Sequence, residues 1–409
     1  MAEEKQAETK DHKQLGRELD LFVFSDLVGS GLPLWTPRGT LVRNLLDEYV
    51  WELRKKHGYQ KVAIPHITKK ELYETSGHWD KFGDDLFHIT TREGHELALK
   101  PMNCPHHIQI FARRPHSYRE MPQRFCETTM MYRDEQSGEL NGLSRVRAIT
   151  IDDAHVFCRE LQIRAEFSKI WEIISEFYGT FGFALQVRLS FHDPKSPEKY
   201  LGDKKRWEFA ESTLKSIAEE KGVEKTLPGV GEAAFYGPKL DFMANDSLGR
   251  QWQVATIQLD MNMPERFDLT CINENGEKER VAMVHYAVMG SIERFLSVIL
   301  EHLQGALPLW LSPVQAKVLP VSEKHAAYAE EILEQFRAAD IRVGLSADDS
   351  LGKRIRGAKL EKVPYVLVVG DAEVDAKTAT LEGRAGKIGA LPIADIIHRL
   401  KEEIRTRAG

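Results

Sequence analysis

The sequence is poor in cysteine, carries little net charge and has no long apolar run. Its 409 residues include four cysteines, none of them in a CxxC pair, which argues against a disulfide framework and favours a reducing compartment. The 56 basic and 62 acidic residues give a net charge of -6, which excludes a protein that holds nucleic acid by bulk charge but not one with a local basic face. No apolar segment approaches the ~20 residues that a membrane-spanning helix needs, and the charged start MAEEKQAETK lacks the apolar core of a secretory signal. We therefore expect a soluble cytoplasmic protein without a membrane anchor.

Length and hydrophobic periodicity indicate two folded domains after a short polar tail. A chain of 409 residues is too long for a single core. We expect a disordered tail at 1–10, a first domain at 11–310 and a second domain at 311–409. The first has many strands and few crossover helices, which predicts an α+β fold with an antiparallel sheet and flanking helices. The second alternates strands with helices, as a small α/β domain does.

Individual elements can be located from their patterns. Apolar positions at helical spacing predict a helix over 41–56 that ends before Gly58, and KVAIPHI (61–67) is typical of a strand that ends at Pro65. An antiparallel pair is expected around the polar loop 137–144. The other elements expected are a helix at about 160–181, strands at 184–191, 239–244 and 251–258, a strand running into a helix over 283–303, and a closing helix at 393–405.

Three residues with metal-binding side chains stand far apart in the chain. They are Cys104 in PMNCPHH, His155 in DDAHVF and His285 in MVHYAV. A catalytic zinc takes three protein ligands of these types and keeps one position open. The spacing of the three residues carries no signal of its own, however, and among 15 histidines the ordinary interpretation of any one is a surface or satisfied core residue.

The two commonest nucleotide-binding motifs, GxxxxGK[ST] and GxGxxG, are absent. Arginines flank the polar loop instead: Arg133 and Glu135 precede it, Arg145 and Arg147 follow it, and Arg294 begins a predicted helix. Such arginines can clamp a polyphosphate through forked hydrogen bonds, although surface solubility explains any single one of them.

A second basic feature is the predicted helix over 351–362. It carries Lys353, Arg354, Arg356, Lys359 and Lys362. On a weakly acidic chain these residues form a local basic stripe that could bind the phosphate backbone of a nucleic acid. A solvated helix face explains it equally well.

Three segments, in this order, resemble the signature motifs of the class II aminoacyl-tRNA synthetases. They are GYQKVAIPHI (58–67) with Pro65, YRDEQSGELNGLSRVRAI (132–149) with Arg133 and Glu135, and AVMGSIERFL (287–296) with Gly290, Glu293 and Arg294. Each motif is loose alone, but their order and spacing are specific. Over residues 11–409 the resemblance sharpens to the threonyl-tRNA synthetases through KPMNCPHH, DDAHVFC, FYGPKLDF, WQVATIQLD and VHYAVMGSIER.

The resemblance implies an enzyme that activates threonine with ATP to threonyl-adenylate and transfers it to the 3′ end of tRNA(Thr). It implies a catalytic domain at 11–310, an anticodon-binding domain at 311–409 and a homodimer through the Pro65 region. It also implies Mg²⁺ with ATP, and one zinc ion on Cys104, His155 and His285 that selects the threonine amine and hydroxyl. The other residues it implies are Arg133, Lys239 and Arg294 for catalysis; Arg133, Glu135, Arg145, Gln253, Thr256 and Arg294 for ATP; Met102, Asp153, Tyr236, Gln258 and Ser291 for threonine; and Lys353, Arg356 and Glu373 for tRNA.

The sequence departs from the family pattern at five positions. Gln136, Asn141 and Ile151 stand where proline, histidine and glutamine are usual, and Asp348 and Glu382 fall where the family reads the anticodon. The family's N-terminal editing domain has no counterpart here, so measurable seryl-tRNA formation is expected. Two alternatives stay open: a non-catalytic relative that binds tRNA, and a class II synthetase for serine or proline, which would not need the Cys–His–His set.

Overall fold

The computed structural model describes residues 9–408 and forms two compact units. Of the tail predicted at 1–10, residues 1–8 lie outside the described residues. The smaller unit consists of residues 9–23, Leu34–Leu46 and 299–408, and the larger unit consists of Phe24–Pro33 and Asp47–Val298. Within residues 9–408, no helix is both long enough and apolar enough to cross a membrane.

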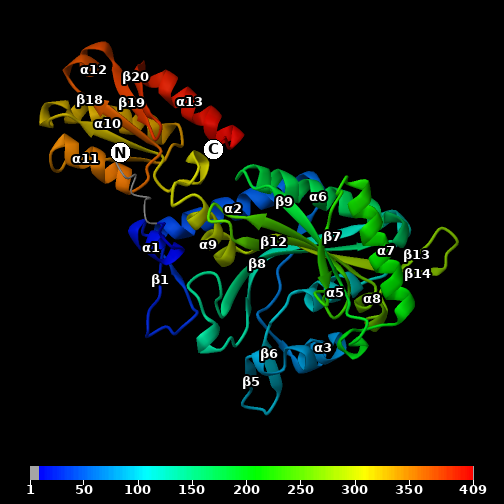
Figure 1. Cartoon of the computed structure of the whole chain (residues 1–409). Helices are drawn as coiled ribbons and strands as arrows, with labels where there is room; N and C mark the ends of the chain where they lie inside the picture. Colours follow the sequence, from blue (N-terminus) through cyan, green and yellow to red (C-terminus); the bar gives the residue numbers. More distant parts are fainter. Residues whose placement is uncertain (1–8, 409) are drawn as a thin grey trace, which may run out of the picture. The chain divides into compact units, whose positions relative to one another are not determined.

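The larger unit is built on an eight-stranded sheet with the strand order β10-β9-β11-β12-β15-β8-β7-β3. Its neighbouring strands are antiparallel except at the two edges, where β10 pairs with β9 and β3 with β7 in parallel. Helix α6 (Ile163–Gly179) lies on one side of this sheet, and α5 (Cys104–Ala112) and α8 (Met263–Arg266) lie on the other (Figure 1). The predicted antiparallel sheet with flanking helices is confirmed. The strands are β3 (Gln60–Lys61), β7 (Gln123–Tyr132), β8 (Ala148–Cys158), β9 (Leu185–Phe191), β10 (Leu227–Val230), β11 (Lys239–Asn245), β12 (Gln251–Asp260) and β15 (Ala282–Ser291).

The central strands β8 and β15 are almost continuously buried, because helices cover both faces of the sheet. β7 and β8 pair from Gln123↔Phe157 to Tyr132↔Ala148 and enclose the polar loop between them, as predicted. β15 leads directly into α9 (Ile292–His302), which matches the predicted strand-to-helix segment. β8 carries Asp153 and His155, and β15 carries His285, into the centre of the unit.

The segment 61–67, predicted to be a strand that ends at Pro65, is mostly irregular. β3 ends at Lys61, β4 (Ile67–Lys69) begins at Ile67, and the residues between them are irregular. Pro65 has no N–H to donate to a strand ladder, so the segment cannot pair along its whole length. The elements that were not predicted include β5 (His88–Thr90) and β6 (Glu96–Leu99), which form a separate sheet with β4, and α7 (Lys204–Glu220).

The C-terminal part of the smaller unit is a five-stranded sheet in the order β17-β16-β18-β19-β20. The alternation of strands and helices through β18 is as predicted, and β16 pairs in parallel with both β17 and β18. The antiparallel hairpin of β19 and β20 was not predicted. The elements are β16 (Ala316–Pro320), α10 (Ala326–Ala338), β17 (Val343–Leu345), α11 (Leu351–Leu360), β18 (Tyr365–Val369), α12 (Asp371–Ala376), β19 (Thr378–Gly383), β20 (Gly386–Pro392) and α13 (Ile393–Thr406).

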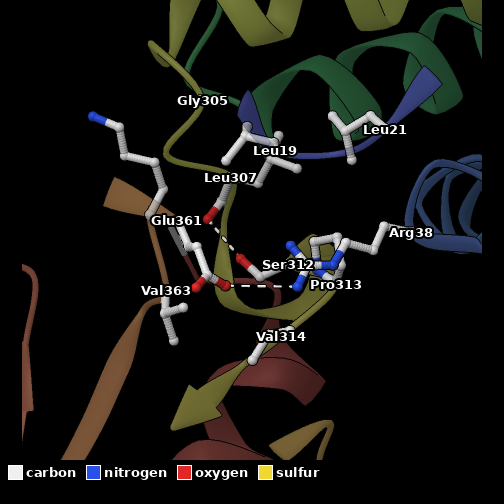
Figure 2. A pocket seen from close by; sticks show the side chains of 11 residues that line it. Leu19, Leu21, Arg38, Gly305, Leu307, Ser312, Pro313, Val314, Glu361 and Val363 are labelled. Atoms are coloured by element: carbon white, nitrogen blue, oxygen red, sulfur yellow. Dashed lines mark hydrogen bonds and ion pairs between the residues drawn. The ribbon is translucent and has the colours of Figure 1, made fainter. Parts of the chain in front are cut away.

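Figure 2 shows a cavity in the smaller unit between Leu19, Leu307 and the residues that follow α11. On its wall, Arg38 Nη2 lies 3.6 Å from Glu361 Oε2. Lys317, which does not line the cavity, has its Nζ 2.5 Å from Glu361 Oε1. The cavity offers about 20 Å³, which is room for one water molecule. The cavity is therefore too small for a ligand, and the ion pairs of Glu361 hold the surrounding segments together.

Arg354 does not belong to the basic stripe predicted on α11. It is buried, and its Nη1 donates to the carbonyl oxygens of Pro320 at 2.7 Å and Ser346 at 2.9 Å. The side chain therefore ties α11 to the ends of β16 and β17. Lys353, in contrast, is exposed, and its Nζ lies 3.1 Å from Asp349, which precedes the helix.

Replacing Arg354 by methionine is expected to lower the free energy of unfolding by about 2 kcal/mol, because two buried carbonyl groups lose a charged donor. The matched variant Lys353→Met should change it by less than about 0.5 kcal/mol, because an exposed pair contributes little. Urea unfolding measures both. Equal stability of the two variants would show that Arg354 does not tie these elements together.

Candidate active site

Cys104, His155 and His285 converge in the larger unit although 181 positions separate the first from the last. His155 on β8 and His285 on β15 are direct cross-strand partners, with their rings 4.8 Å apart. Cys104 begins α5, and the chain reaches the two histidines from that side of the sheet. One ligand atom from each of the three lies within 4.8 Å of the others, and all three side chains are buried.

A second layer of side chains orients these three residues. His285 Nε2 lies 2.9 Å from Asp260 Oδ2, His155 Nδ1 lies 2.8 Å from His107 Nδ1, and Cys104 Sγ lies 3.6 Å from His78 Nε2. Each imidazole is therefore held through one ring nitrogen, which leaves the other nitrogen for a metal. The sequence analysis missed Asp260, His107 and His78, because no spacing rule connects them to the three ligands.

The donor set fits zinc. Burial raises the pKa of the Cys104 thiol well above its ordinary value, and the carboxylates of Asp153 and Asp260 raise it further. Burial also lowers the pKa of His155 well below its ordinary value, so this imidazole is neutral and able to bind a metal. A divalent cation would stabilise the thiolate that burial disfavours. A thiol and two imidazoles are of the types that a catalytic zinc takes as its three protein ligands, with the fourth position open.

Three of the five residues predicted to bind threonine, namely Asp153, Tyr236 and Gln258, lie in or beside this cluster. Asp153 Oδ1 is 3.7 Å from His155 Nε2, and its Oδ2 accepts a hydrogen bond from Asn103. Tyr236 stacks on His285 with ring centroids 4.7 Å apart, and its hydroxyl donates to Gln258 Oε1 at 2.5 Å.

Met102 and Ser291 connect this cluster to the predicted nucleotide residues. Met102 Sδ lies 3.3 Å from Arg133 Nη2, and the Ser291 hydroxyl donates to Glu293 at 2.9 Å. Ser291 lines a neighbouring cavity of about 180 Å³. The walls of that cavity also include Arg133, Glu135, Arg145, Arg294, Met131, Val146, Ile149 and Ile151.

Arg133 is the arginine of this cavity that is best placed to receive an anion. Burial lowers the pKa of its guanidinium, and among the described residues its Nε is buried without a hydrogen-bond partner. An unpaired buried donor at a cavity wall indicates a missing acceptor. Glu135, in contrast, pairs with Arg145 at 2.6 Å, and Arg294 Nε donates to the carbonyl oxygen of Ser144 at 3.1 Å.

Lys239, Gln253 and Thr256 do not line this cavity. Lys239 Nζ lies 3.2 Å from the buried carboxylate of Asp241, and Gln253 Nε2 donates to the same carboxylate at 2.9 Å. Arg188, which the sequence analysis missed, donates both to Asp241 and to Gln253. Thr256 accepts from Gln258 at 3.4 Å. These residues form a polar network across β9, β11 and β12.

The predicted tRNA-binding residues lie in the smaller unit. Lys353 and Arg356 are exposed on α11. Glu373 is already engaged: it accepts from the backbone N–H of Gly370 at 3.0 Å and from the Thr380 hydroxyl at 2.8 Å, and so caps its own helix. Glu382, one of the departures, lies 2.9 Å from Lys359.

Comparison with known proteins agrees with this geometry. Residues 87–303 match the family described as tRNA synthetase class II core domain (G, H, P, S and T), and residues 315–403 match the anticodon binding domain. A crystal structure described as the RNA binding domain of threonyl-tRNA synthetase from Cryptosporidium parvum superposes with a TM-score of 0.90 at 36% identity, covering 96% of this chain and 98% of that one. The chain belongs to the threonyl-tRNA synthetase family.

Curated relatives in this family extend beyond the present chain. It is 44% identical over 404 residues to the threonine–tRNA ligase of Cytophaga hutchinsonii and 46% identical over 404 residues to that of Porphyromonas gingivalis. Each match covers 98% of this chain and 62% of the relative. The predicted fold class, a class II synthetase core with an anticodon-binding domain, is confirmed for this family member.

Proposed function

We propose that the chain is a threonine–tRNA ligase that forms threonyl-adenylate from threonine and ATP and then transfers threonine to the 3′ end of tRNA(Thr). The observation that carries this proposal is the convergence of Cys104, His155 and His285 beside Asp153. A cavity with three arginines in its walls lies next to this cluster, as a site for an amino acid and a nucleotide requires. We assign residues 11–310 to catalysis and residues 311–409 to anticodon binding.

The amino-acid end of the site must distinguish threonine from valine, which has nearly the same shape. Cys104, His155 and His285 would hold a zinc ion, which supplies open coordination positions for the amine and the hydroxyl of threonine. Asp153 accepts a hydrogen bond from the threonine hydroxyl, and Tyr236 and Gln258 border the same cluster. A site that bonds a hydroxyl rejects the analogue without it far better than a shape-only pocket does.

The nucleotide end supplies positioning and charge. The threonine carboxylate attacks the α-phosphorus of ATP, and pyrophosphate leaves. The guanidinium of Arg133 balances the charge that grows on the α-phosphate, with Arg294 and Arg145 binding the other phosphates and Glu135 the adenine amino group. The family resemblance assigns Lys239, Gln253 and Thr256, on β11 and β12, to the ATP site as well, although they do not line this cavity. Mg²⁺ accompanies the ATP.

The second step and the assembly are proposed on the same family grounds. The terminal tRNA hydroxyl attacks the carbonyl carbon of the adenylate, and AMP leaves. Lys353 and Arg356, exposed on α11, would contact tRNA, together with Glu373. Two copies would associate through the Pro65 region. No protein nucleophile is needed in either step.

Pyrophosphate exchange with threonine, valine and serine tests the proposal. We expect exchange with threonine, a rate for valine lower by ~10⁴ because the hydroxyl is missing, and a rate for serine lower by only about 10–200-fold because a single methyl group is missing. Metal analysis of the same sample should find one zinc per chain. Absence of exchange with every amino acid would indicate a non-catalytic relative. Preference for serine or proline without zinc would indicate another class II synthetase.

A further inference from the structure

Arg54, near the end of α2 (Pro37–Lys56), is a buried arginine with no place in the chemistry described so far. Its Nη2 donates to the carbonyl oxygen of Asp152 at 2.7 Å and to Asp152 Oδ2 at 3.0 Å, and its Nε donates to the Tyr286 hydroxyl at 3.1 Å. Asp152 precedes Asp153 on β8, and Tyr286 follows His285 on β15. The guanidinium therefore bridges the two strands that carry the histidine ligands.

The same two strands lose their register just beyond this bridge. Ala287 on β15 faces Asp153 on β8, but the next paired residue of β15 is Ser291, which faces Ile151. Two steps on β8 thus correspond to four on β15, so β15 carries a bulge. The bulge includes Gly290, which has a positive φ of 69°.

Asp152 fills the gap that the bulge leaves in the ladder. Its carboxylate accepts the backbone N–H of Val288 and that of Met289, each at 2.9 Å. The Tyr178 hydroxyl, from α6, donates to the carbonyl oxygen of Val288 at 2.8 Å. Asp152 is completely buried, and Arg54 is the cation that pairs with it at 3.0 Å. Removing Arg54 would leave the buried carboxylate of Asp152 without a charge partner, at a cost in free energy. A shift of the bulge would lower that cost.

The bulge lies between the two halves of the active site. His285 and the strand position opposite Asp153 come before it, whereas Arg294, in the wall of the nucleotide cavity, comes after it. Its geometry therefore sets the distance between the amino-acid end and the nucleotide end. We propose that Arg54 is a positioning residue which, through Asp152, fixes the offset of these two halves for adenylate formation. This inference rests on the proposed ligase function.

The expected result is a selective loss of the chemical step. Arg54→Met should lower the kcat of threonine-dependent exchange by about 10²-fold, because reacting groups displaced by about 1 Å react that much more slowly. The KM for ATP should stay within about threefold, since the residues of the nucleotide cavity are unchanged. The visible spectrum of the cobalt-substituted protein should also change, because β8 and β15 carry both histidine ligands. Arg54→Lys should recover at least about tenfold of the lost rate, because it restores the charge.

A matched variant separates positioning from stability. Arg124 makes a similar two-point ion pair with Glu166, between β7 and α6, and does not bridge β8 and β15. Arg124→Met should lower the melting temperature but keep kcat and the cobalt spectrum at temperatures where it is folded. Tyr286→Phe, which removes the hydroxyl that accepts from Arg54 Nε, should lower kcat detectably even if Arg54→Met fails to fold.

Two results would overturn the inference. One is a folded Arg54→Met protein with the kcat and cobalt spectrum of the wild type. The other, if Arg54→Met does not fold, is an unchanged kcat in Tyr286→Phe. Failure of the proposed function looks different, because the wild-type protein itself would then show no threonine-dependent exchange. In that case, the cobalt spectra of the wild type and Arg54→Met alone decide whether Arg54 positions the two strands.

Discussion

Replacing Cys104 by alanine is expected to remove the zinc and threonine activation together. Two imidazoles from neighbouring strands would remain, and a metal held by them alone loses the thiolate that completes the set. Without the metal the pocket must recognise threonine by shape, so the exchange rate with threonine should fall by ~10⁴. The metal content and the exchange rate are measured on the same preparation.

Cys271→Ala is the matched control for this prediction, since Cys271 is also a free, buried cysteine of the larger unit and is not one of the three clustered ligands. It should keep one zinc per chain and full exchange. A zinc-free Cys104→Ala protein that still activates threonine would contradict the selecting role of the metal. Loss of activity with zinc retained would place the role of Cys104 elsewhere.

Arg133→Met is expected to give the second large effect, a fall of about 10³-fold in the kcat of exchange with zinc still bound. The reason is the position of the guanidinium at the cavity wall, where its Nε has no partner among the described residues. A single preorganised donor at developing charge is worth about 10²–10³-fold, and a forked, charged donor lies at the upper end of that range.

Lysine at position 133 distinguishes charge from geometry. It restores the positive charge without the planar fork, so Arg133→Lys should recover only part of the lost rate. Serine-dependent exchange should fall by the same factor as threonine-dependent exchange, because Arg133 acts on the nucleotide and not on the side chain of the amino acid. A fall confined to threonine, or a loss of zinc, would show that Arg133 acts through the metal cluster instead.

The sequence predicted the framework of the larger unit better than it predicted the contacts within it. The polar loop between β7 and β8 correctly predicted an antiparallel pair. The apolar pattern over 283–303 correctly predicted that β15 runs into α9. The strand that was predicted to end at Pro65 is almost absent, because β3 already ends at Lys61. Arg354 was wrongly assigned to the exposed basic stripe of α11. The number of basic residues in a helix does not show which of them points inward and donates to a carbonyl group.

The metal cluster could not be derived from spacing, because strand register and not sequence proximity brings His155 to His285. Only the resemblance to a known family connected Cys104 to them. The same limit explains why Arg54, Asp152 and Asp260 escaped notice: each acts through a partner on another element. Lys239 and Gln253 were identified by their family segment, but their shared carboxylate, Asp241, became visible only in the folded sheet.

The pairing of His155 with His285 has a consequence for the order in which the protein matures. Both are held by neighbouring antiparallel strands, and the 129 residues between them include β9, α7, β11 and β12. The intervening polypeptide must close this long loop before the two imidazoles can meet, at a cost in chain entropy. An ion bound here would therefore not nucleate folding, as it does in a zinc finger. It would bind only after the central sheet has largely formed, so metal binding would report the completion of that sheet.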